Sequence, residues 1–279
     1  MDLDKLLATR TRERSDLLDR IVAVLRDDRR VRADWLSGSV GRGDEDALSD
    51  LDLSVVVSDE SIGEFVANRR FFAAQPALPV LLMDNLANAP DDGAYLLVSY
   101  PGEAGPQQVD WFWQGESQTR VPDDAKVLFD DAGLSLIPGD EWRRQSHRPP
   151  GSPLEANAPV GDLLTHKIVF FWSMSVVVAK YIARRDGETV ARMTRLIART
   201  LSEAARLFSA GAVAAWYDET LESSLASAGG VRQFEVLEAL AHDAEELGGQ
   251  LVEHGAILPS EAIAHIYRFF ELTKAMVAR

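Results

Sequence analysis

Two aspartates separated by one residue, Asp50 and Asp52, stand at the start of an apolar run in the segment 36–57, LSGSVGRGDEDALSDLDLSVVV. Side chains alternate across a strand, so both carboxylates would point to the same face, about 7 Å apart between Cα atoms. Neighbouring carboxylates raise each other's pKa unless a cation lies between them. Mg²⁺ favours carboxylate oxygens together with substrate phosphates. The pair therefore predicts a metal site that a nucleoside triphosphate completes.

A glycine and a serine, Gly38 and Ser39, precede these aspartates by about ten residues. Without a Cβ, glycine lets backbone N–H groups approach a phosphate closely. A short helix beginning here would also direct its positive end at that phosphate. The Ser39 hydroxyl and the Arg42 guanidinium could add hydrogen bonds to the same group. We therefore expect Gly38, Ser39 and Arg42 to bind the triphosphate, although Arg42 could equally be a surface residue.

A third carboxylate, Asp110, lies inside the apolar stretch QQVDWFW at 107–113. An aspartate in such a strand is costly if it is buried and unpaired. Alternation places Asp110 on one face and Trp111 and Trp113 on the other, where we expect core. If this strand lies beside 51–58, three carboxylates meet, as two-metal catalysis requires. The alternative is that Asp110 sits near an edge strand and faces water.

The segment 36–57 resembles the signature of the DNA-polymerase-β-like nucleotidyltransferase superfamily, which is Gly-Ser, about ten residues, then Asp-x-Asp between apolar neighbours. The stretch VDWFW is similar to the later strand that carries the third carboxylate, and VLFDDAG (127–133) looks like the strand and turn that follow it. The layout, a small sheet and then a helical bundle, resembles aminoglycoside and lincosamide nucleotidyltransferases. The match is close over 36–57, loose over 107–133, and beyond residue 150 only the layout supports it.

The resemblance implies transfer of a nucleoside monophosphate to a hydroxyl, with release of pyrophosphate. By position, Gly38 and Ser39 would bind the nucleoside triphosphate, and ATP is the first expectation. Asp50 and Asp52 would hold Mg²⁺, and Asp110 would be the third ligand or the base. Such enzymes often use a lysine on the first helix of the second domain, which makes Lys167 the first choice here. Lys167 could instead extend to solvent from its helix.

Three classes of function stay open. The first is an enzyme acting on a small hydroxylated acceptor, and the acidic composition makes a cationic acceptor such as an aminoglycoside attractive. The second is a protein-directed AMP transferase or antitoxin-type regulator, which the long helical second half disfavours. The third is a catalytically inactive nucleotide-binding module. The sequence does not indicate the oligomeric state.

Composition narrows the partners of this 279-residue chain. The net charge of −15 disfavours nucleic-acid binding, which needs clustered Lys and Arg, although the same charge could serve only solubility. Without cysteine the chain has no disulfide, thiolate metal site or cysteine nucleophile. The longest apolar run, 168–179, is shorter than the roughly 20 residues that span a bilayer. Because the start of the chain also has no signal-peptide core, we expect a cytoplasmic protein with no membrane partner.

The elements that must position these residues divide at a Pro- and Gly-rich linker, 145–162. We expect a nucleotidyltransferase domain over 1–150 and a helical bundle domain over 151–279. The class is α+β, a small mixed sheet with flanking helices followed by an all-α bundle. The predicted strands are 33–39, 51–58, 78–84, 94–100, 107–113 and 125–133, and the predicted helices are 3–29, 58–72, 160–185, 187–210, 212–228, 231–254 and 259–278.

Overall fold

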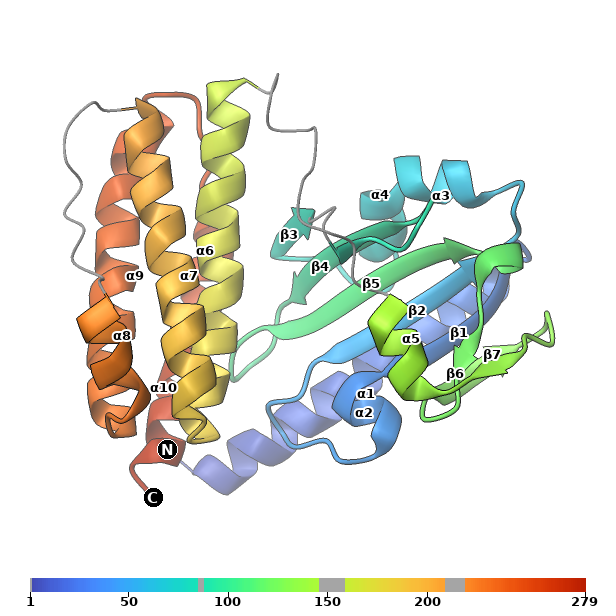
Figure 1. Ribbon diagram of the computed structural model, residues 1–279, viewed down its shortest axis with the longest axis horizontal. Helices are drawn as coiled ribbons and strands as arrows, with labels where there is room; N and C mark the ends of the chain where they lie inside the picture. Colours follow the sequence, from blue (N-terminus) through green and yellow to red (C-terminus); the bar gives the residue numbers. More distant parts are fainter. Residues whose placement is uncertain (1, 85–87, 146–158, 209–218) are drawn as a thin grey trace. The chain divides into compact units, whose positions relative to one another are not determined.

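The computed structural model describes residues 2–84, 88–145, 159–208 and 219–279, and it confirms the α+β class (Figure 1). Its internal contacts separate two compact units. The sheet unit contains residues 7–102 and 107–152, and the helical unit contains residues 1–6, 103–106 and 153–279. The grouping does not test whether either unit folds alone, so the domain boundary near residue 150 stays a prediction.

A mixed six-stranded sheet forms the centre of the sheet unit, in the order β3-β4-β5-β2-β1-β7. The central strands β2 and β5 are parallel, and the other neighbouring pairs are antiparallel. A separate pair, β6 and β8, is parallel and was not predicted. The strands are β1 Val31–Ser37, β2 Leu51–Val57, β3 Leu81–Asp84, β4 Ala94–Tyr100, β5 Gln107–Gly115, β6 Val121–Pro122, β7 Lys126–Asp130 and β8 Leu136–Ile137.

One face of this sheet carries the main core. Helix α1 (Leu3–Asp27) contributes Leu17, Ile21 and Leu25 to that core, and Figure 1 shows it behind β1 and β2. Trp111 and Trp113 lie in the same cluster, stacked with ring centroids 5.3 Å apart. Their predicted place on the core face is therefore confirmed, and it leaves the opposite face of β2 and β5 for Asp52 and Asp110.

The single helix predicted over 58–72 is wrong, because two short helices lie here, α3 (Ile62–Ala67) and α4 (Arg69–Ala74). Asn68 separates them with φ −109° and ψ 19°. Its side-chain amide donates to the Glu64 carbonyl at 3.0 Å, a local bond with which asparagine competes against helix continuation. The short helix considered after the first strand is present as α2 (Gly38–Arg42), and two further short helices, η2 (Glu116–Gln118) and α5 (Gly139–Gln145), were not predicted.

Among the described residues, five helices make up most of the helical unit, in which α6 contacts α7, α9 and α10. They confirm the predicted bundle, although the predicted linker and the start of the helix predicted over 212–228 lie mostly outside the described residues. The helices are α6 Val160–Ala183, α7 Gly187–Phe208, α8 Glu219–Ala226, α9 Gly230–Val252 and α10 Ser260–Val277.

Helix α6 is long and apolar enough to cross a membrane, by length and composition alone, and half of its most apolar window is buried inside the protein. Core helices of soluble proteins also combine length with apolar composition. The finding is weak evidence for either interpretation, so the cytoplasmic location stays a prediction.

Candidate active site

Strand pairing brings two of the three predicted carboxylates together. In the parallel pair of β2 and β5, the Cα of Asp52 is the register partner of the Cα of Asp110. Both residues are half-buried and share one face of the sheet. Strand β5 lies between β4 and β2, so the edge-strand alternative for Asp110 is wrong. The condition that strand 107–113 lies beside 51–58 is therefore met, and it creates a pair of neighbouring negative charges.

The backbone of Gly38 lies directly against one of these carboxylates. A Cβ built on Gly38 would come within 1.9 Å of Asp52 Oδ2, and the φ of Gly38 is +64°. Ser37, the register partner of Asp52 on β1, makes no side-chain capping bond to the short helix α2 that begins at Gly38. Glycine is therefore required here twice, for its left-handed φ and for the close approach of the carboxylate.

Hydrogen bonds connect α2 to the loop that follows it and fix the chain just before Asp50, which directly precedes β2. The Ser39 hydroxyl donates to Ser49 Oγ at 3.0 Å, and the Ser49 hydroxyl donates to Asp46 Oδ1 at 3.1 Å. The backbone N–H of Asp46 donates to Ser49 Oγ at 3.0 Å. Ser39 thus stabilises the loop with its hydroxyl, and its predicted contact with a phosphate stays a prediction.

Two arginines on α1, Arg10 and Arg14, were missed by the sequence analysis. Arg14 is buried, and its Nη1 donates to the carbonyls of Asp46 at 2.6 Å and Ser49 at 2.9 Å. Burial, and next the charge of Arg14, lower the pKa of Arg10 to about 10, while nearby carboxylates including Asp50 act in the opposite direction. Two cations therefore offset the negative charge at this end of β2.

A periodic signal for these arginines is present in the sequence. Arg10 and Arg14 precede Leu17, Ile21 and Leu25 at the spacing of one helix face. Charged residues in register with an apolar stripe are candidates for burial against specific partners.

Tyr95 on β4 was also missed, and it contacts Asp110. Its hydroxyl donates to Asp110 Oδ1 at 2.5 Å, and only 3% of the residue is exposed. Burial raises the pKa of Tyr95 well above its ordinary value, and the charges of Asp110 and Asp52 raise it further. The phenol therefore stays protonated and acts as a hydrogen-bond donor to the carboxylate.

The two predicted cationic phosphate ligands both form ion pairs. Arg42 lies 3.3 Å from Asp44, with both side chains exposed. Lys167 on α6 lies 3.0 Å from Glu203 on α7, inside the helical unit. Neither contact tests triphosphate binding, so both roles stay predictions.

The carboxylates have suitable chemistry for Mg²⁺, which favours hard oxygen ligands. Within the described ranges of the chain, however, no group of three or more His, Asp or Glu side chains is arranged to hold a metal ion by itself. Because fewer than three such side chains of the described residues meet here, further oxygens, such as those of a triphosphate, would have to complete the coordination of a cation. The residues fit a cation that is shared with a nucleotide, and Asp50, Asp52 and Asp110 as ligands stay a prediction.

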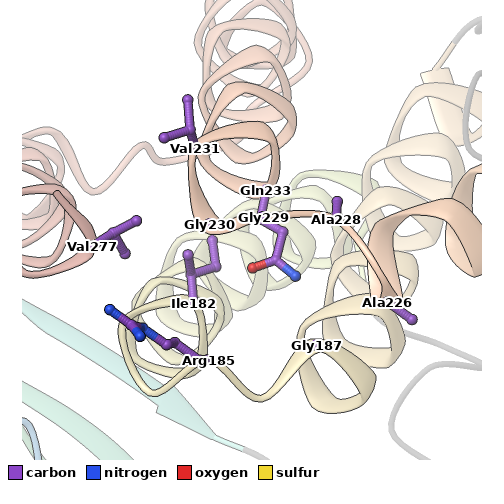
Figure 2. Close-up of a pocket in the computed structure, with 10 residues that line it drawn as sticks. All are labelled: Ile182, Arg185, Gly187, Ala226, Ala228, Gly229, Gly230, Val231, Gln233 and Val277. Atoms are coloured by element: carbon purple, nitrogen blue, oxygen red, sulfur yellow. The ribbon is translucent and has the colours of Figure 1, made fainter.

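A cavity of about 390 Å³ lies within the helical unit, where α6 ends and α9 begins (Figure 2). Arg185 is the one charged residue among the described residues that line it. The amide of Gln233, also in the lining, donates to the Leu225 carbonyl at 3.0 Å. Gly230 permits close packing, because a Cβ there would lie 2.6 Å from Val277. The predicted site residues are not part of this lining.

Comparisons with known proteins give distant structural likenesses and no match to a family model or a curated protein. Among solved structures, the chain is similar to the STING-associated CdnE c-di-GMP synthase from Capnocytophaga granulosa, at 10% sequence identity and a TM-score of 0.27. The alignment covers 96% of this chain and 81% of that one. At so low a TM-score, the likeness carries no argument about activity.

Proposed function

We propose that this chain is a nucleotidyltransferase that moves a nucleoside monophosphate from a nucleoside triphosphate, with ATP as the first candidate, to a hydroxyl of a small acceptor. The observation that carries the proposal is the meeting of Asp52 and Asp110 on adjacent strands, with the Gly38 backbone against the Asp52 carboxylate. This combination places paired carboxylates beside a stretch of backbone that a phosphate could approach.

In the proposed reaction, the acceptor oxygen bonds to the α-phosphorus and the bond from that phosphorus to the bridging oxygen breaks. Pyrophosphate leaves, and the acceptor proton passes to a carboxylate or to solvent. The N–H groups of Gly38 and Ser39 would bind the triphosphate, and Arg42 and Lys167 would add cationic contacts to it. Asp50, Asp52 and Asp110 would hold Mg²⁺, which when bound neutralises charge on the transferring phosphate.

The acceptor is proposed to be small and cationic. The net charge of −15 would attract a cation and repel nucleic acid. An aminoglycoside has the required hydroxyls and positive charge, a lincosamide has the hydroxyls, and an acceptor that is no antibiotic would suit the same chemistry.

Incubation with labelled ATP, GTP, CTP and UTP, Mg²⁺ and a panel of aminoglycosides and lincosamides tests the proposal. Pyrophosphate release with label on a small acceptor would support it. Label on protein would support a protein-directed AMP transferase, and nucleotide binding without turnover would support an inactive nucleotide-binding module.

Substitution of Asp52 tests the site assignment within the same assay. We expect Asp52→Asn to lower turnover on the order of 100-fold or more, because it removes a charged oxygen ligand. Asp131→Asn is the matched control, since Asp131 is an exposed aspartate directly after β7. An Asp52→Asn variant as active as Asp131→Asn would overturn the assignment.

A further inference from the structure

The side chain of Tyr95 connects β4 to the predicted site on β5. Its hydroxyl donates to Asp110 Oδ1 at 2.5 Å. Its ring lies beside that of Phe112, with centroids 5.0 Å apart and an interplanar angle of 53°. Phe112 is also the register partner of Tyr95, so the backbone pairing and the ring contact together fix the position of the hydroxyl.

Asp110 needs such a constraint because it lies beside a second negative charge. The torsion that turns an aspartate carboxylate is soft, with broad minima, and Asp52 occupies the register position on the next strand. A buried hydroxyl that donates to one carboxylate oxygen restricts this rotation, since breaking the bond would leave a buried donor unsatisfied. Tyr95, only 3% exposed, is such a donor.

We infer that Tyr95 is a positioning residue, whose hydroxyl orients the Asp110 carboxylate so that it and Asp52 can share one divalent cation with the triphosphate. This inference rests on the proposed nucleotidyl transfer and deepens it. Hydrogen bonds from an outer residue to a metal ligand typically account for about 10- to 100-fold in metal affinity or activity. Tyr95 acts through Asp110, and its role is orientation of that carboxylate.

The test compares Tyr95→Phe with Tyr100→Phe. Both changes remove one hydroxyl from a buried tyrosine of β4 and leave the ring in place. The Tyr100 hydroxyl donates to the Ala73 carbonyl at 2.5 Å. Because the two tyrosines are five positions apart on one strand, they face opposite sides of the sheet. Tyr100→Phe therefore controls for the loss of a buried hydrogen bond as such.

The measurement is Mn²⁺ affinity in the presence of a non-hydrolysable ATP analogue, by electron paramagnetic resonance, alongside denaturant unfolding, kcat and KM. We expect Tyr95→Phe to weaken Mn²⁺ binding about 10-fold or more and to lower kcat. Tyr100→Phe should keep the wild-type affinity even where it lowers stability. Phe112→Leu, which loosens the ring packed beside Tyr95, should weaken Mn²⁺ binding in the same direction and serves if Tyr95→Phe fails to fold.

Wild-type Mn²⁺ affinity in Tyr95→Phe, or an equal loss in Tyr100→Phe, would overturn the inference while the proposed function stands. A wild-type chain that binds no Mn²⁺ with the nucleotide would overturn the proposed function and the inference together. The two failures are distinguishable, because the first appears only between variants and the second appears in the unmodified protein.

Discussion

Gly38 and Asp52 approach so closely that any side chain at position 38 would displace the carboxylate: a Cβ there would lie 1.9 Å from Asp52 Oδ2. Gly38 also has φ +64°, a conformation that side chains disfavour. The collision and the backbone strain that a side chain at position 38 would cause have different consequences. Backbone strain lowers stability wherever it occurs, whereas the collision would displace the Asp52 carboxylate from the position it has beside Asp110.

Gly38→Ala should therefore lose both stability and turnover, and Gly43→Ala should lose stability alone. Gly43 has φ +74°, and a Cβ there would meet nothing within 4 Å. A left-handed backbone costs alanine about 1–2 kcal/mol, so Gly43→Ala should be destabilised by that amount and Gly38→Ala, which adds the collision, by at least as much. Denaturant unfolding measures the shared strain, and pyrophosphate release measures the effect on the site. Equal turnover in the two variants would show that the Asp52 position does not matter for the reaction.

The shared face of Asp52 and Asp110 could be predicted on the condition that their strands pair, because alternation fixes the face to which each side chain points. Each of the two strands contains one aspartate, and the face opposite to that aspartate is mostly apolar. If both apolar faces enter the core, both carboxylates must lie on the other face of the sheet. The tryptophans of β5 follow from the same rule, since they occupy the opposite parity and enter the core.

Tyr95, Arg10 and Arg14 could not be placed in this way, because their roles depend on tertiary register. The segment AYLLVSY predicts a strand but not which residue of β5 stands opposite Tyr95. Likewise, α1 was predicted from its period, yet the loop that Arg14 contacts is set by how the helix packs on the sheet. The break at Asn68 was not predicted, because a local side-chain hydrogen bond to the Glu64 carbonyl accompanies it and the helical pattern of the sequence does not reveal that bond.

A buried acid in β1, Asp34, makes the stability of the protein depend on pH. It is 0% exposed, and its register partners, Val55 and Phe129, belong to the main core. Neither carboxyl oxygen makes a hydrogen bond of normal geometry to the described residues. Burial raises the pKa of Asp34 well above its ordinary value, partly offset by the charge of Arg26.

Asp34→Asn should therefore stabilise the protein increasingly as pH rises. The unfolded chain loses the Asp34 proton near about pH 4 while the folded chain keeps it, so wild-type stability falls from there up to the folded pKa. Each pH unit between the two pKa values lowers the free energy of unfolding of the wild type by about 1.4 kcal/mol. Urea unfolding at about pH 5 and about pH 8 measures the change. A constant difference between Asp34→Asn and wild type across this range would contradict the expectation.

Asp28→Asn is a control in which the effect of pH on stability has the opposite sign to that in Asp34→Asn. The hydrogen bonds from Arg30 hold the pKa of Asp28 below its ordinary value. Its contribution to stability is therefore present above the unfolded pKa and is lost as pH falls through the folded one. Asp28→Asn should be less stable than wild type at neutral pH, and the difference should shrink in acid.

Lys167→Met tests whether Lys167 binds the triphosphate in addition to forming its ion pair with Glu203. Lys167 lies 3.0 Å from Glu203, which Arg199 also contacts at 2.8 Å, so Glu203 keeps a cationic partner when the lysine is removed. The cost in stability should accordingly stay within about 1 kcal/mol. Loss of a charge-assisted bond to the triphosphate should raise the KM for the nucleotide about 10-fold or more.

Lys274→Met is the matched control, because Lys274 on α10 forms a comparable pair with Glu238 on α9 at 2.7 Å. Both variants remove one lysine from an ion pair between helices of the helical unit. If the increase in KM requires contact between Lys167 and the nucleotide, Lys274→Met should leave KM unchanged at the same ionic strength. Equal KM values in both variants would assign Lys167 to the ion pair with Glu203 alone, since a general loss of positive charge would affect the two alike.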